Sequence, residues 1–190
     1  MANADNRFGL VPINKNGAVE TGQVTRYYVP ASATTAVGVG DAVVRNGTAN
    51  TIDGVPQVIS YEDAGGARMT GSVVGVEFDP TDLETTYRKA GTGRYVFVAD
   101  APNQDFIIQA DGAVAVTDIG LNADVVFTHP LVTNYGTSGM ELDSSSLATT
   151  ATLPLKVKRL HNVSENEFGT NSVVVVSINN HTEAANTAGI

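Results

Sequence analysis

Short apolar runs of strand length, separated by turn residues, recur along most of the chain and limit its fold more than any other feature. About ten such runs can be delimited between Gln23–Pro30 and Ser172–Ile178, whereas helix-period patterns are scarce. Gly, Pro, Asn and Asp fall between the runs, where tight turns favour them. The pattern predicts an all-β sandwich or barrel that forms a single domain over residues 22–180.

The stretch Arg94–Asp111 contains two of these runs, Tyr95–Val98 and Phe106–Ile108, joined by the polar segment Asp100–Asp105. We expect a central buried hairpin here, with the polar segment as its solvent-facing turn. The first run is apolar on both faces, so it should be covered on one side by the core and on the other by a second layer or a partner chain. The continuous run Val173–Val176 is likewise expected to be buried on both faces.

Two local signals predict a turn and a helix. Asn46-Gly47 favours a tight hairpin turn, because both residues tolerate positive φ, and a return strand is expected near Thr51–Ile52. Asp79-Pro80 resembles a helix start, with a capping carboxylate followed by proline at the first helical position, and predicts one short helix over residues 80–90. A calcium loop is the alternative for these acidic residues, but they lack the ligand spacing of an EF-hand.

The two ends of the chain differ from its middle. Residues 1–21 carry isolated apolar side chains among polar ones, without a period of two or 3.6. This pattern is typical of an extended arm whose apolar side chains dock into something else; a strand that caps its own domain is the alternative. Residues 181–190 are expected to form a frayed C-terminal tail.

Composition restricts the partners. The chain of 190 residues has 20 acidic and 11 basic side chains and a net charge of −9, so phosphate would repel it and nucleic acid is not an expected partner. Cysteine is absent, which excludes disulfides and thiolate metal sites and fits synthesis in a reducing cytoplasm. We find no signal peptide and no apolar run long enough to span a bilayer, so no membrane association is expected.

Catalytic patterns are not evident. His129, His161 and His181 are scattered and form no metal-type pair. The run Ser144–Ser146 lacks the Gly-x-Ser-x-Gly elbow of a serine nucleophile. Asp105 and Asp111 are weak candidates for a carboxylate pair in glycoside chemistry. We therefore expect a protein that is not an enzyme and that binds neither cofactor nor metal.

Several segments, taken in order, carry a resemblance to a known family. They are Asn3–Pro12, Arg26–Ser32 with Val39–Val44, Arg94–Pro102 with Phe106, and a C-terminal block of Leu142–Ser146, Thr150–Lys156, Asn166–Gly169 and Val175–His181. Their joint order across most of the chain is similar to that of tailed-bacteriophage capsid decoration proteins, also called head cement proteins. No single segment is specific, because each also fits ordinary strand and turn chemistry. Departures are expected at 79–91 and 134–139.

The resemblance implies a non-enzymatic protein on the outer surface of the virion capsid, made in the host cytoplasm. It would bind the major capsid protein, bridge neighbouring copies of it, and self-associate as a trimer or dimer on a capsid symmetry axis. The expected capsid-interface residues lie in the arm: Phe8, Leu10, Val11, Pro12 and Ile13.

The alternative from a different class is a β-sandwich module of a phage tail or surface that binds a glycan or receptor. That function predicts aromatic side chains exposed on loops, for which Tyr61, Tyr87 and Tyr135 are the candidates. An acidic hydrolase is the third and least favoured possibility, because no catalytic base is evident.

Overall fold

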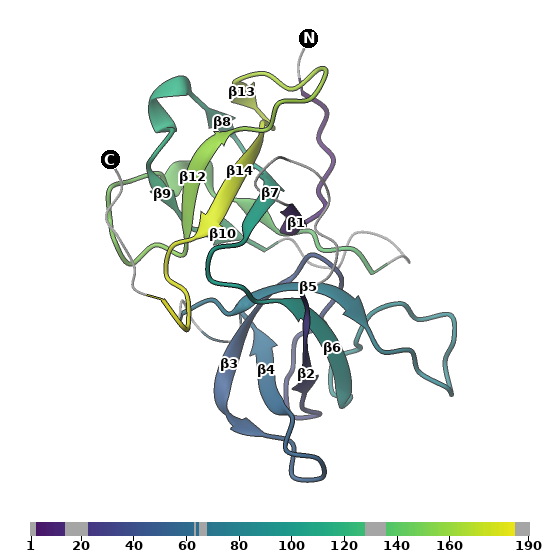
Figure 1. The fold of residues 1–190 in the computed structure, drawn as a ribbon. Coiled ribbons are helices and arrows are strands. Elements are labelled where there is room, and N and C mark those ends of the chain that lie inside the picture. Colours follow the sequence, from purple (N-terminus) through teal and green to yellow (C-terminus); the bar gives the residue numbers. More distant parts are fainter. Residues whose placement is uncertain (1–2, 14–22, 63, 65–67, 128–135, 185–190) are drawn as a thin grey trace.

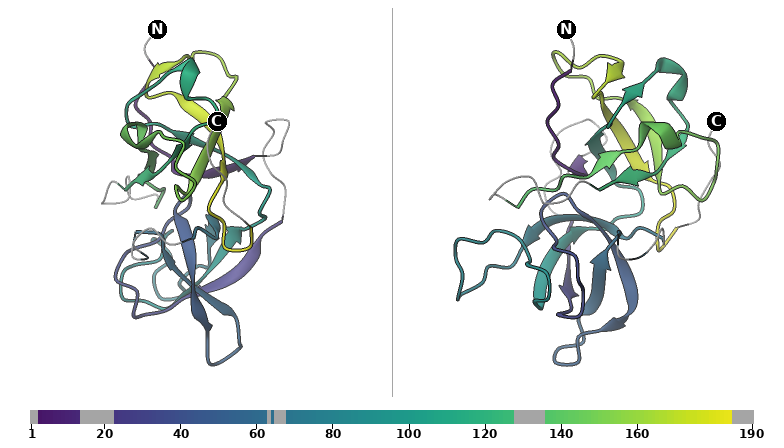
Figure 2. Two further views of the ribbon diagram at one scale, coloured as in Figure 1. Left: turned by 90° about the vertical axis from the view of Figure 1, so that its left-hand side faces the viewer. Right: turned by 180° about the vertical axis from the view of Figure 1, so that it is seen from behind.

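The computed structural model describes residues 3–13, 23–62, 64, 68–127 and 136–184, and it is built from a closed barrel and a five-stranded sheet. Figure 1 shows the barrel below the sheet, and the two further views in Figure 2 keep this arrangement. The all-β fold predicted from the short apolar runs is confirmed.

The barrel takes its strands from the first part of the chain, and the sheet takes most of its strands from the second. The barrel, in the order β2-β4-β3-β5-β6, contains β2 (Thr25–Val29), β3 (Ala42–Ala49), β4 (Pro56–Ser60), β5 (Gly71–Val76) and β6 (Arg94–Ala99). The sheet, in the order β1-β7-β14-β12-β9, contains β1 (Val11–Ile13), β7 (Asp105–Gln109), β9 (Asn122–Ala123), β12 (Leu155–Leu160) and β14 (Val173–Ile178). Two short ribbons pair β8 (Ala113–Val114) with β13 (Gly169–Thr170) and β10 (Val125–Val126) with β11 (Glu141–Leu142).

The core follows from the alternation of side chains along the strands. In β6, Val96 and Val98 point into the barrel and are fully buried, whereas Tyr95 and Phe97 point outward. In β14, which lies between β7 and β12, Val174–Val176 is fully buried, as the continuous apolar run predicted. The larger core cluster combines sheet residues with barrel residues such as Ala42 and Ala99, so barrel and sheet share buried contacts.

The predicted hairpin over Arg94–Asp111 is wrong. Its first strand, β6, pairs with β2 and β5 in the barrel, whereas its second strand, β7, pairs with β1 and β14 in the sheet. The polar segment between them is therefore the passage from barrel to sheet. The prediction failed because alternation indicates which side chains are buried but does not determine which strands pair.

The turn predicted at Asn46-Gly47 is also wrong, because both residues lie inside β3. The register of β3 against β4 shifts between Arg45 and Ala49, and Gly47 adopts a φ of 78° within this irregularity. A bulge uses the same positive φ as a hairpin turn, so the local signal is shared by the two structures. The chain reverses instead at Asn50–Val55, and Thr51–Ile52, expected as a strand, belongs to that turn.

The helix predicted over residues 80–90 does not form; this segment belongs to a long loop of turns between β5 and β6. Asp79 does accept the Thr81 N–H, as a capping residue would, but the backbone continues in turns: the Asp82 N–H donates to the Asp79 carbonyl oxygen at 3.1 Å and the Thr85 N–H to that of Asp82 at 3.4 Å. The described residues contain only two short 3₁₀ helices, η1 (Val116–Asp118) and η2 (Ser144–Ser146). Within the part of the chain that is described, no helix has the length and apolarity needed to cross a membrane.

The C-terminal tail begins later than predicted. His181 is buried and forms an isolated bridge with Met69, and the Thr182 N–H donates to the Met69 carbonyl oxygen at 3.0 Å. Glu183 forms an ion pair with Arg45 at 2.9 Å. Residues 181–184 are therefore packed against the barrel, while 185–190 lie outside the described residues.

Candidate functional site

The predicted arm is, over residues 3–13, a segment docked along its own chain, which we call the N-terminal strap. Leu10 and Ile13 are 0% and 3% exposed, and β1 pairs antiparallel with β7. The alternative of a strand that caps its own domain therefore describes this part of the arm. Phe8, Val11 and Pro12 are half-buried, so they retain some exposed surface for a partner, whereas Leu10 and Ile13 do not.

The strap contacts the sheet near its start, the barrel side at Leu10, and the sheet again through β1. Near its start, the Asn6 N–H donates to Gln109 Oε1 at 2.8 Å, and Gln109 Nε2 donates to the Ala4 carbonyl oxygen at 2.8 Å. At the barrel, the Leu10 N–H donates to the Gly40 carbonyl oxygen at 2.8 Å. The strap therefore contacts both β assemblies through backbone groups.

A cluster of aromatic and charged side chains on the outside of the barrel is the best candidate for a functional surface. We call it the barrel face and define it by Arg26, Tyr28, Tyr95 and Phe97. The register of β2 against β6 places Tyr28 opposite Tyr95 and Arg26 opposite Phe97. Phe97 is 36% exposed and the Arg26 side chain is 43% exposed, so no second layer built from the described residues fully covers β6.

Contacts within the barrel face hold its side chains in place. The Arg26 guanidinium carbon lies 3.6 Å from the centroid of the Tyr95 ring, a cation–π geometry, and the Tyr28 and Tyr95 ring centroids are 5.1 Å apart. The Tyr95 hydroxyl donates to Asp53 at 2.6 Å and accepts a bond from Asn50 Nδ2 at 2.8 Å. These side chains are thus ordered before any partner arrives.

The hydrogen bonds and ion pairs around Tyr95 and Arg26 also shift the pKa values of the neighbouring side chains. The hydrogen bond from the Tyr95 hydroxyl is the main cause of the lowered pKa of Asp53, and the bond to Asp53 raises the pKa of Tyr95. Arg26 lies 3.8 Å from Asp53 and 3.4 Å from Glu77, measured between side-chain nitrogen and oxygen atoms. Arg26, the charged residue of the barrel face, is therefore paired with two acidic neighbours, Asp53 and Glu77.

Phe97 also has a structural role. Gly75 of β5 lies opposite Phe97, and a Cβ built on this glycine would lie 3.6 Å from the Phe97 ring, so the ring packs over the glycine backbone. Covering a strand glycine with a cross-strand aromatic ring stabilises the sheet. This role does not account for the exposed part of the ring.

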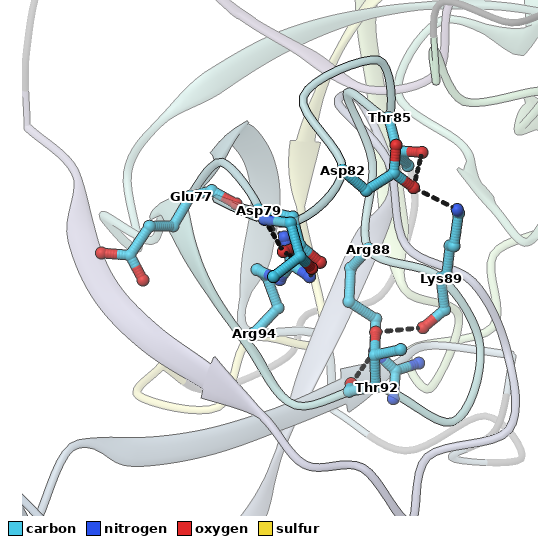
Figure 3. A network of polar contacts seen from close by, with 9 residues as sticks. Glu77, Asp79, Asp82, Thr85, Arg88, Lys89, Thr92 and Arg94 are labelled. Carbon is cyan, nitrogen blue, oxygen red and sulfur yellow. Dashed lines mark hydrogen bonds and ion pairs between the residues drawn. The ribbon is translucent and has the colours of Figure 1, made fainter.

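The loop over residues 77–93 borders the barrel face, and polar contacts brace it (Figure 3). Asp79 accepts bonds from Thr81 and Arg94, and Asp82 accepts bonds from Thr85 and Lys89. Thr81, followed by Arg94, lowers the pKa of Asp79 to about 2, and Lys89 is the largest cause of the lowered pKa of Asp82.

Phe78 is displayed at the start of this loop with 70% of its surface exposed. Because Asp79 and Asp82 are already paired with Arg94 and Lys89, contact with a partner through Phe78 would not leave these two carboxylates unpaired.

A buried arginine fixes the base of the loop. Arg88 is fully buried, and its guanidinium donates to the carbonyl oxygens of Pro30, Ala33, Thr35 and Thr92 at 2.7–2.9 Å. Its backbone also bridges to Val37. The loop is therefore attached to the segment that connects β2 to β3.

The catalytic candidates from the sequence that lie within the described part of the chain have structural contacts that account for them. Asp105 is paired with Lys158, and Asp111 accepts the Ser144 N–H at 2.9 Å, so each carboxylate has its own structural partner. His161 directly follows β12 of the sheet, His181 bridges to Met69 beside the barrel, and His129 lies outside the described residues. Among the described residues, no group of three or more His, Cys, Asp or Glu side chains is arranged to hold a metal ion.

The loop aromatics that a glycan-binding module would use are not displayed as predicted. Tyr61 is 5% exposed and stacks on Phe127 with ring centroids 6.2 Å apart, and burial raises its pKa to about 12. Tyr87 is half-buried, and Tyr135 lies outside the described residues. The exposed aromatic side chains are others: Phe78 and Phe168 on loops, 70% and 41% exposed, and Phe97 on a barrel strand, 36% exposed.

The sequence contained one signal for the barrel face, namely the two-sided apolar character of Tyr95–Val98, but not its partners Arg26 and Tyr28, which the strand register supplies. Comparisons of the chain with protein-family models, with curated proteins and with solved structures found no match.

Proposed function

We propose that this protein is a non-enzymatic capsid decoration protein that binds the outer surface of a phage head and stabilises contacts between neighbouring major capsid proteins. The observation that carries the proposal is the barrel face, a partly exposed and pre-ordered surface of Tyr, Arg and Phe side chains on barrel strands. The ordered sequence segments that resemble head cement proteins supply the identity of the partner. Self-association as a trimer or dimer on a symmetry axis is part of the same proposal.

The chemistry of the barrel face suits a protein partner. Tyr and Arg are enriched among the residues that dominate binding energy at protein interfaces, and side chains that are already ordered lose little entropy on binding. A sugar site would need open ring faces beside free polar groups that orient the ligand. Here Arg26 covers one face of the Tyr95 ring, and the Tyr95 hydroxyl already has two hydrogen-bond partners.

Mass action explains how such binding would strengthen a shell. A protein that binds only the assembled, expanded lattice stabilises that lattice over every state it does not bind. The gain from each copy is modest, but a shell presents many equivalent sites. The acidic charge of the chain also keeps it away from packaged DNA.

The experiment adds purified protein to expanded, undecorated heads and measures the bound copies per head. Phe97→Ala is expected to lower the affinity by about tenfold, because truncating an interface anchor costs on the order of 1–2 kcal/mol. Leu83→Ala is the matched control, since Leu83 is 74% exposed on the loop over 77–93 but outside the barrel face. Failure of the unmodified protein to bind heads would reject the proposed function.

The strap requires a different test from simple deletion. Removing residues 1–21 would also remove β1 and the buried side chains Leu10 and Ile13, so lost binding could reflect lost folding. Any capsid contact of the strap is proposed for its partly exposed residues, Phe8, Val11 and Pro12. Phe8→Ala tests this contact while keeping the buried anchors.

A further inference from the structure

The loop between β12 and β14, residues 161–172, is longer than its connection requires. β12 and β14 are antiparallel neighbours, and such strands are ordinarily joined by about two to five residues. The loop carries β13 and displays Val163 and Phe168, which are 47% and 41% exposed. Figures 1 and 2 show it at the end of the molecule opposite the barrel.

Side chains of the loop and its base hold this backbone in one conformation. Asn166 Nδ2 donates to the carbonyl oxygens of His161 and Val173 at 2.7 and 2.8 Å, and Asn166 Oδ1 accepts the Val173 N–H at 3.0 Å. Ser172 Oγ lies 2.8 Å from the Glu167 carbonyl oxygen and 2.7 Å from that of Gly169. The loop is therefore stabilised well beyond what a simple connection needs.

The N-terminal strap braces the loop from outside. Asn3 Nδ2 lies 2.9 Å from the carbonyl oxygens of both Glu167 and Thr170, and the Glu167 N–H donates to Asn3 Oδ1 at 3.0 Å. A shallow depression between strap and loop is lined by Phe8 and Val163, among others. Strap and loop thus present one joint surface.

Two residues of the loop are held in a strained conformation. Glu165 and Asn171 have φ angles of 68° and 58°, in the left-handed region. Asparagine tolerates this region, but for glutamate it is uncommon and costs on the order of 1 kcal/mol. Strain of this kind persists where the surrounding contacts impose it, and it is frequent in loops that bind.

We propose that loop 161–172 is a second docking surface, which takes a protein surface with an apolar pocket rimmed by Lys or Arg. Val163 and Phe168 would enter the pocket. Within residues 162–171 the charged side chains are Glu165 and Glu167, both exposed, so a basic rim complements them. A second copy of this chain is disfavoured, because it has a net charge of −9 and presents the same acidic loop.

This inference rests on the proposed function and deepens it. With the barrel face at one end and loop 161–172 at the other, one copy contacts two neighbouring shell subunits. Binding at both ends is bivalent, so the loop adds to overall affinity and also couples the two subunits mechanically. A copy attached through the barrel face alone would bind one shell subunit, and it would not couple that subunit to its neighbour.

The test uses expanded, undecorated heads as the probe and the double variant Val163→Ala/Phe168→Ala. We expect this variant to bind heads about tenfold more weakly and to lose the increase in head rupture temperature even at saturating occupancy. The double variant Glu165→Gln/Glu167→Gln is expected to show a smaller difference in affinity between low and high salt than the unmodified protein. Leu83→Ala should match the unmodified protein in all three measurements.

The outcomes separate the inference from the proposed function. If both loop variants match the unmodified protein while Phe97→Ala weakens binding, the second surface is rejected and the decoration function stands. If the unmodified protein does not bind heads, both are rejected. Sedimentation that shows self-association abolished by Phe168→Ala would assign the loop to a second copy and overturn the inference. Equal urea midpoints for the unmodified protein and the two loop variants verify that the folding of these variants is unchanged. Phe97→Ala also uncovers Gly75, so a far-UV circular dichroism spectrum like that of the unmodified protein verifies that it is folded when it is tested.

Discussion

Substitution of Gly9 by alanine tests the contact on which the N-terminal strap depends. Gly9 has a φ of 75° and lies where the strap crosses the barrel at Gly40 and passes Ser138. A Cβ at this position would lie 2.8 Å from the Gly40 carbonyl carbon and closer still to the Gly40 oxygen and to Ser138 Cβ. The Gly40 backbone cannot shift away from the added methyl group without cost, because it has a φ of 92° and its carbonyl oxygen accepts the Leu10 N–H.

The expected loss of stability has a lower and an upper bound. The left-handed conformation costs alanine about 1–2 kcal/mol, and forcing a methyl group into a packed contact adds roughly 1–3 kcal/mol. If the strap undocks instead, Leu10 and Ile13 become exposed, which costs about 1.5–3 kcal/mol for each side chain. We therefore expect Gly9→Ala to lower the free energy of unfolding by about 2–5 kcal/mol.

Gly54→Ala is the matched control, because Gly54 has a φ of 74° but nothing within 4 Å of the added methyl group. Gly54→Ala should lower the free energy of unfolding only by the cost of placing alanine in the left-handed conformation, about 1–2 kcal/mol. Urea unfolding followed by far-UV circular dichroism measures both variants, since the chain has no tryptophan to report by fluorescence. Losses that agree within about 0.5 kcal/mol would refute the steric argument.

Two further predictions concern the loop over 77–93. Arg88→Met should lower the free energy of unfolding by about 3–5 kcal/mol, because it leaves four carbonyl oxygens without their buried donor; a loss below about 1 kcal/mol in urea unfolding would contradict this. The Asp79 carboxyl, with its pKa lowered from 3.8 to about 2, should stabilise the loop above pH 4 and lose this contribution as the pH falls toward 2. Thr81→Ala should move the carboxyl titration, followed by carbon-13 NMR, upward toward 3.8; an unchanged midpoint would show that the Thr81 hydroxyl is not the main cause.

Periodicity predicted burial better than it predicted pairing. Alternation placed Val96 and Val98 on one face of their strand, although it did not tell which face is inward, and the continuous run Val173–Val176 predicted the burial that Val174–Val176 shows. The partners of β6 were not, because they depend on residues far away in the sequence, and a polar turn between two apolar runs fits a hairpin as well as a crossing between sheets. Local turn and cap signals failed because each fits two structures: the positive φ of Gly47 serves a bulge as well as a hairpin turn, and the capping carboxylate of Asp79 begins a non-helical turn as well as a helix.

The candidate site could be predicted only in part. Tyr95 and Phe97 lie two residues apart in a strand, so their common face was evident, and their apolar character predicted a cover over each face of the strand, by the core on one side and by a second layer or a partner chain on the other. The register of β2 against β6 places Tyr28 opposite Tyr95 and Arg26 opposite Phe97, and no local sequence pattern specified this register. The arm prediction failed at Leu10 and Ile13 for a similar reason, because isolated apolar side chains look alike whether they dock on the same chain or on another.

The strap also determines whether the two proposed docking surfaces act together. Asn3 holds loop 161–172, while Leu10 of the same segment is bonded to Gly40 and to Ser72 of the barrel. The contacts of the barrel face do not include the strap, since they join β2, β5, β6 and the turn after β3. Loosening the strap should therefore leave attachment through the barrel face intact while weakening the brace on the loop. Under conditions where it remains folded, Gly9→Ala is expected to bind heads yet to stabilise them less than Gly54→Ala does, and equal stabilisation by the two variants would show that the loop does not depend on the strap.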